Sequence, residues 1–228
     1  MSTATDEDTR QLSWSVIEAR GSDARSFLQG QLSQDLESLG SHGAWTLVLA
    51  PDSVVLAVGH VRERDDGLDL VVPRELGDVA QSRLRRFLLR SACTLELREI
   101  DQGPYGTLAE QIDAHWPGPS EIERKLTPHS FGRAFVDATV SFTKGCFTGQ
   151  ELVGRLDARG SSVPWRVVRV EGKDERTIDE YLRSKGPEGP QGLTSAVRRD
   201  SGVIGLGVAH RTLLSGEPPE GVVVGELS

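Results

Sequence analysis

Apolar residues recur with two different periods along the first two fifths of the chain. Runs rich in β-branched residues predict strands at 14–19, 44–50, 54–61, 68–72 and 94–97. The segment 74–90 instead carries apolar residues at a spacing near 3.6, which predicts an amphipathic helix. A shorter helix is expected from Ser22 or Asp23, either of which can cap it, to Gly30. Strands and helices in this order favour an α+β sandwich, with helices on a face of an antiparallel sheet.

The pattern changes after Gly160. Short apolar runs predict strands at 163–170, 193–197, 203–209 and 222–225, and the charged, Gly- and Pro-rich stretch 171–191 predicts a loop with one short helix. We therefore expect an α+β domain over residues 11–160 and a small C-terminal β-barrel domain over residues 161–228. The polar residues 1–10 are expected to form a disordered tail.

Composition narrows the classes of partner. The formal net charge is −8 over 228 residues, which argues against a nucleic-acid-binding surface because phosphate contacts need a basic field. Four arginines between residues 83 and 90 are better explained as a solvated helix face. No apolar run reaches the length of a membrane-spanning helix, so we expect no membrane partner.

The two cysteines, Cys93 and Cys146, form neither a disulfide framework nor a C-x-x-C pair. This usage is typical of a reducing compartment and predicts a cytoplasmic protein. The five histidines are scattered, so we expect no metal site and no iron–sulfur cluster held by this chain. Cys93 alternates with Leu95 and Leu97, which places it in the predicted core.

A thiol stands at the predicted entrance of a helix near residue 150. Thr148 and Glu151 have the spacing of a capping box, so we expect the helix to begin at Thr148 and to end at Gly160. Lys144 and the helix N-terminus would both favour the thiolate of Cys146, which predicts a reactive thiol. From the spacing alone, a small apolar residue at a helix entrance is the better explanation of Cys146.

The octapeptide Lys144–Glu151 (KGCFTGQE) is similar to the signature of the YgfZ family, folate-binding proteins related to the T-protein (aminomethyltransferase) of the glycine cleavage system. The segment 21–31 and the stretches 192–196 and 205–207 also resemble that family. The resemblance implies a T-protein-like fold and tetrahydrofolate, or a one-carbon derivative of it, as ligand. It also implies a role in the assembly, maturation or repair of iron–sulfur proteins, with client proteins or assembly factors as partners.

The resemblance also implies functional residues. Cys146 and Lys144 become the candidate reactive pair, and Lys144 and Arg155 could hold the glutamate tail of a folate in one cavity with Gln150. Outside the motif, Glu123 becomes the candidate carboxylate for the pterin, although a solvated surface glutamate is the better explanation of this residue. The other candidate ligand contacts are Gly145, Phe147, Gly149, Glu151, Gln29 and Gln31. Gln29 and Gln31 could instead satisfy local backbone groups.

The chain departs from the family pattern after Pro51. Family members usually carry Gly-Arg there, whereas this chain has Asp52 and Ser53. Two alternatives therefore stay open: a folate-dependent, aminomethyltransferase-like one-carbon transferase, and an interaction scaffold without a ligand. We do not expect a conventional enzyme.

Overall fold

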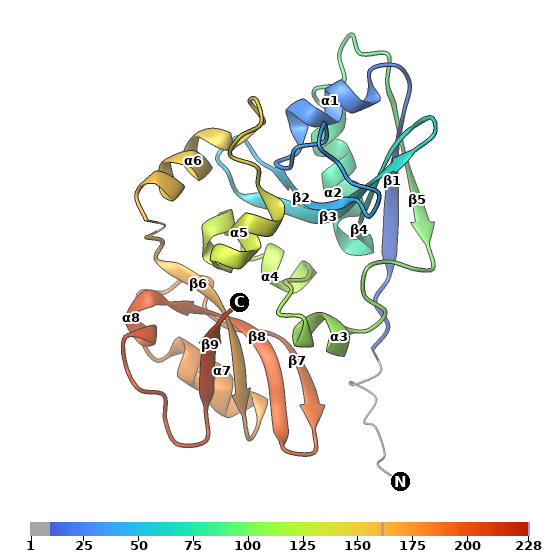
Figure 1. Cartoon of the computed structure of the whole chain (residues 1–228). Coiled ribbons are helices and arrows are strands. Elements are labelled where there is room, and N and C mark those ends of the chain that lie inside the picture. Colours follow the sequence, from blue (N-terminus) through green and yellow to red (C-terminus); the bar gives the residue numbers. More distant parts are fainter. Residues whose placement is uncertain (1–9, 161, 228) are drawn as a thin grey trace.

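Two antiparallel sheets organise the molecule (Figure 1). The computed structural model describes residues 10–160 and 162–227; of the predicted tail, residues 1–9 therefore lie outside the described residues. The backbone carbonyl of Arg10 accepts a hydrogen bond of 3.0 Å from the backbone N–H of Leu108. In the described part of the chain, no helix has the length and apolar character needed to cross a membrane.

The first sheet has the strand order β2-β3-β4-β1-β5. Its strands are β1 (Trp14–Arg20), β2 (Ala44–Leu49), β3 (Val55–Arg64), β4 (Gly67–Pro73) and β5 (Thr94–Ile100). The helices of this part are α1 (Ala24–Gln31), α2 (Arg74–Arg85), α3 (Leu108–Asp113), α4 (Pro119–Ile122), α5 (Arg133–Thr139) and α6 (Gln150–Ala158), with a 3-10 helix, η1, at Pro128–Phe131. The prediction made α2 too long, because turns replace the helix after Arg85 and Arg90 takes a positive φ of 68°.

The register of the first sheet separates two faces. One row across the sheet is entirely apolar, and α1 and α2 pack on this side to form the main core; the row consists of Ala44, Val61, Leu70, Ile17 and Leu97. The next row points to the opposite face and mixes aromatic, aliphatic and basic residues: Trp45, His60, Val71, Val16 and Arg98. Neighbouring residues of a strand point to opposite faces, so one helix-covered face and one mixed face follow from the sequence.

The second sheet has the order β7-β8-β6-β9. Its elements are β6 (Trp165–Gly172), α7 (Glu175–Arg183), β7 (Gly192–Arg199), β8 (Gly202–His210), α8 (Arg211–Leu214) and β9 (Val223–Glu226). Val168 packs with Ile178 and Leu182 of α7, whereas Val167 and Val208 join the main core. The second sheet therefore buries its two faces against different neighbours.

The strands predicted beyond residue 163 pair among themselves and not with the first sheet (Figure 1). Residue 161, next to the predicted boundary, lies outside the described residues. The closure of these strands into a barrel and the division into domains at residue 160 stay predictions.

Candidate functional site

The segment with the sequence KGCFTGQE lies in the loop that leads from α5 into α6. The helix begins at Gln150, with Gly149 as its N-cap at a φ of 82° and no side-chain cap. The predicted capping box is therefore wrong: the hydroxyl of Thr148 donates instead to Oε1 of Gln31 at 3.4 Å. A Cβ on Gly149 would lie 2.7 Å from the carbonyl oxygen of Ala50, so the loop meets the end of β2 where only glycine fits.

A pocket of about 540 Å³ opens around Cys146. Its thiol is free and exposed, whereas the neighbouring ring of Phe147 is 7% exposed and belongs to the main core. The side-chain Oε1 of Gln150 accepts a hydrogen bond of 3.3 Å from the backbone N–H of Phe147. The loop is thus anchored by its phenylalanine and presents its thiol outward. The pocket is lined by Pro51, Cys146, Phe147, Thr148, Gly149, Gln150, Glu151 and Gly154.

Lys144 is buried and does not belong to the lining of this pocket. Its ammonium donates to the backbone carbonyls of Gln29 at 2.5 Å, Leu32 at 2.8 Å and Gln34 at 2.9 Å. Three donors are all that an ammonium has, so its hydrogen-bonding capacity is used in full. Burial lowers the pKa of Lys144 to about 8, against the opposing effects of Asp35 and Glu37. The structure thus uses this lysine to hold the end of α1, although the sequence predicted a cationic neighbour for the thiol or for a ligand carboxylate.

The two predicted glutamines already have protein partners. Gln29 donates from Nε2 to Oδ1 of Asp35 at 2.8 Å and accepts at Oε1 from the backbone N–H of Leu36 at 2.7 Å. Oε1 of Gln31 accepts from Nη1 of Arg83 at 3.3 Å as well as from Thr148. Gln29 therefore satisfies local groups, and Gln31 links α2 to the motif loop.

Arg83 is a buried residue of this region that sequence reasoning assigned to a solvated helix face. Its side chain is 5% exposed, its Nε donates to the carbonyl of Leu49 at 3.0 Å, and its guanidinium lies 4.3 Å from the centre of the Phe87 ring. Burial and the charge of Arg86 lower its pKa. The sequence contained a signal for this burial, because Arg83 follows Leu76 by seven residues and so falls on the apolar face of the helix.

The remaining motif side chains lie at the surface. Glu151 pairs with Arg155 at 2.5 Å across one helical turn, and their side chains are 86% and 52% exposed. Gly145 is exposed as well. Arg155 does not belong to the lining of the pocket around Cys146. The structure therefore brings Cys146 and Gln150 together in one pocket and places Lys144 and Arg155 elsewhere.

The buried carboxylate of the middle region is Glu121. Glu123 is exposed and follows the last residue of α4. Glu121 is fully buried; it accepts from the backbone N–H of Gly118 at 2.7 Å and from the hydroxyl of Ser195 on β7 at 2.8 Å. Burial raises the pKa of Glu121 against these hydrogen bonds. Its place three residues after Gly118 was the available signal, because a carboxylate there can bond the N-cap N–H.

The departure from the family pattern after Pro51 has a structural counterpart. Ser53 is 1% exposed and takes a φ of 69°, a conformation that favours glycine. Its hydroxyl donates to the carbonyl of Gly149 at 2.5 Å. The hydroxyl therefore ties the β2–β3 turn to the entrance of α6.

No group of three or more histidine, cysteine, aspartate or glutamate side chains in residues 10–160 and 162–227 is placed to hold a metal ion. The site as described is thus an exposed thiol on a loop with buried anchors. Its polar lining comes from backbone groups, Thr148, Gln150 and Glu151.

Comparisons with known proteins identify the fold. No protein-family model matches the chain. An uncharacterised protein of Haemophilus influenzae is 24% identical, over 65% of this chain and 68% of that protein. The crystal structure of the glycine cleavage system aminomethyltransferase T from Bartonella henselae has a TM-score of 0.58 with this chain at 14% identity, covering 90% of this chain and 80% of that one. The chain therefore has a fold similar to that of the T-protein, and the predicted α+β class is confirmed.

Proposed function

We propose that this chain is a folate-binding protein of the YgfZ type that supports the assembly, maturation or repair of iron–sulfur proteins. The observation that carries the proposal is the exposed thiol of Cys146, set in a ligand-sized pocket by the KGCFTGQE loop of a T-protein-like fold. Tetrahydrofolate, or a one-carbon derivative, is the proposed ligand. Iron–sulfur client proteins or assembly factors are the proposed partners, in the cytoplasm.

The pocket around Cys146 fits such a ligand in part. Its volume of about 540 Å³ lies in the range of small-molecule sites, and Gln150 supplies an amide. The carboxylates of a folate tail would need cations, yet Lys144 is saturated by carbonyls and Arg155 is paired with Glu151. The residues of this loop can therefore enclose a ring or a one-carbon unit, and the tail must find its charge partner elsewhere.

Three residues of the KGCFTGQE loop have defined roles in this proposal. Phe147 anchors the loop in the core. The side chain of Gln150 accepts a hydrogen bond from the backbone N–H of Phe147, and this bond fixes the loop against the start of α6. Cys146 supplies a nucleophilic sulfur once its proton has left to solvent. Bound folate would supply or accept a one-carbon unit.

Calorimetry with tetrahydrofolate and 5-formyltetrahydrofolate tests the ligand assignment. We expect binding to the wild type and at least about threefold weaker binding to Cys146→Ser, because the sulfur lines the pocket. Cys93→Ser is the matched control, since its sulfur lies outside the pocket in the main core, and should bind as the wild type. Absence of folate binding to wild type would contradict the assignment.

The process role needs a cellular test. In cells that lack this chain, we expect the activity of iron–sulfur enzymes to fall under oxidant stress and to return with the wild-type gene but not with Cys146→Ser. Full recovery with Cys146→Ser would remove the thiol from the proposed role.

A one-carbon transferase is the second candidate, and the similarity to an aminomethyltransferase favours it. Folate-stimulated release of ammonia or formaldehyde from an aminomethyl donor would establish it. A scaffold without a ligand is the third candidate. Ser53 in the turn after Pro51 favours it, because a hydroxyl bonded to Gly149 stands where the family usually carries an arginine.

A further inference from the structure

A second pocket, of about 420 Å³, lies on the mixed face of the first sheet, opposite the helices α1 and α2. It shares no lining residue with the pocket around Cys146. Its walls come from β2, β3 and the loop after β5, segments that are far apart in the sequence. The lining residues are His42, Trp45, His60, Arg62 and the segment 102–105.

Aromatic rings form the wall of this pocket. Trp45 and Tyr105 lie nearly parallel, with 6.0 Å between ring centres and 16° between planes. His60 meets Trp45 edge-on at 5.2 Å, and the ring centre of Trp116 lies 4.4 Å from that of Trp45. Aromatic side chains of this kind interact favourably with another planar ring, either offset-stacked or edge to face.

Arg62 brings a cation to the same pocket. Its cross-strand neighbour on this face is Asp69, whose carboxylate is already held by Arg20 and Arg64 at 2.7 Å each. No ion pair among the described residues engages Arg62, and its Nε is buried without a hydrogen-bond partner. No carboxylate belongs to the described lining. A buried donor without an acceptor costs free energy, so an anion beside Arg62 would restore what folding leaves unpaired.

The pocket is held in shape before any ligand arrives. The indole N–H of Trp14 donates to the carbonyl of Tyr105 at 2.8 Å. Gly103 lies on the same indole, and a Cβ there would come within 2.1 Å of it. Gly43 leaves room for Arg62 in a similar way, because a Cβ would come within 2.9 Å of its Cγ. Preformed walls reduce the entropy that binding must overcome.

We propose that this pocket binds a planar aromatic ring that carries an anionic group, with the ring against Trp45 and Tyr105 and the anion at Arg62. The inference does not depend on the function proposed for Cys146. The ring can come from a nucleotide or from a pterin carboxylate, since both combine a planar ring with an anionic substituent.

Two matched ligand pairs test the proposal on the full chain by calorimetry: AMP against adenosine, and pterin-6-carboxylate against pterin. For at least one pair, we expect the anionic member to bind about tenfold or more tightly than its neutral partner, the effect of one charge-assisted hydrogen bond. The pair that binds identifies the source of the ring.

Variants assign the binding to this pocket. Arg62→Met should abolish the difference within a pair, whereas Arg98→Met, on the same sheet face but outside the lining, should preserve it. Tyr105→Leu should weaken both members by removing one ring, and it leaves Trp45 and its contact with Trp116 in place. The proposal fails if neither pair binds, or if Arg62→Met binds the anionic members as the wild type does.

Discussion

The two pockets differ in how far the protein has used its own polar groups. Beneath the Cys146 loop, the ammonium of Lys144 is bonded to three carbonyls, and both ends of the Gln29 amide have partners. In the second pocket, on the mixed face of the first sheet, the guanidinium of Arg62 has a buried donor without a partner beside an aromatic wall. We call it the sheet-face pocket. The first set of groups stabilises a loop, whereas the second remains available to a ligand. A charged residue within a signature motif can therefore be structural, and one outside it can be free to bind.

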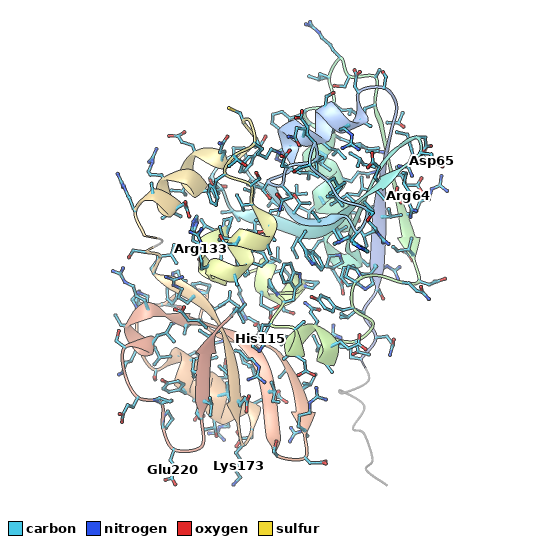
Figure 2. The ribbon with its side chains drawn as sticks, in the orientation of Figure 1. Arg64, Asp65, His115, Arg133, Lys173 and Glu220 are labelled. Atoms are coloured by element: carbon cyan, nitrogen blue, oxygen red, sulfur yellow. The ribbon has the colours of Figure 1, made fainter. Side chains whose placement is uncertain are left out.

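Replacement of Lys144 tests the fully hydrogen-bonded groups beneath the Cys146 loop and should have the largest effect on stability. Lys144→Met leaves the carbonyls of Gln29, Leu32 and Gln34 without their donor, so we expect a loss of about 3 kcal/mol in the free energy of unfolding. Urea unfolding measures it. Lys173→Met, at an exposed position at the end of β6 (Figure 2), should change stability by less than about 0.5 kcal/mol. A small effect for Lys144→Met would mean that the carbonyls do not need the ammonium.

Glu121 provides a second saturated group, this time between the two sheets. Glu121→Ala removes the acceptor of both Gly118 N–H and the Ser195 hydroxyl, and we expect a loss of about 2 kcal/mol. Because the bond to Ser195 reaches β7, hydrogen exchange should rise in β7 as well as in α4. The control is Glu123→Ala, two residues on and exposed, which should leave both measurements unchanged.

His129 is, like Arg62, a buried side chain with unsatisfied polar atoms. It is 1% exposed, and neither ring nitrogen has a hydrogen-bond partner. Asp157, 4.0 Å away, pairs with Arg133. Figure 2 labels Arg133, which belongs to α5. Burial lowers the pKa of His129 below 6.5; Asp157 opposes this, whereas Arg133 and Arg166 add to it.

The sign of the pH dependence follows from that lowered pKa. The unfolded chain takes up a proton at a higher pH than the folded chain, so the stability present above pH 6.5 is lost as the pH falls through the folded pKa. Unfolding measured from pH 7.5 to 4.5 should show this loss for the wild type and a shallower slope for His129→Leu. Equal slopes would mean that the histidine does not titrate with folding.

The surface pair Glu151–Arg155 should have the smallest effect. Both side chains are largely exposed, so Arg155→Gln should cost no more than about 0.5 kcal/mol. It should also leave folate affinity unchanged, because Arg155 does not line the pocket around Cys146. Calorimetry checks the second point, and clearly weaker binding would return Arg155 to the ligand site.

Local patterns were sufficient to predict the strands of the first sheet and the position of α2, but not α3 or α5. The β1–β5 strands and α2 follow from periods of two and of about 3.6, which are properties of neighbouring residues. The partners of Lys144 are 110 to 115 residues away in the sequence, and no local pattern indicates them. The sheet-face pocket likewise joins residues near 42–62 to the segment 102–105. The burial of Glu121 could not be predicted for a related reason, since it depends on β7, more than seventy residues later.

Alkylation of the two cysteines tests the central claim, which is that the KGCFTGQE loop presents a reactive thiol in the wall of a ligand pocket. Cys146 is exposed, whereas Cys93 is 8% exposed, and burial with the nearby charge of Asp23 raises the pKa of its thiol. In the native protein, we predict that iodoacetamide modifies Cys146 at least about tenfold faster than Cys93, and that 5-formyltetrahydrofolate slows only the first reaction. Equal rates for the two thiols, or modification of Cys146 only after unfolding, would contradict the account.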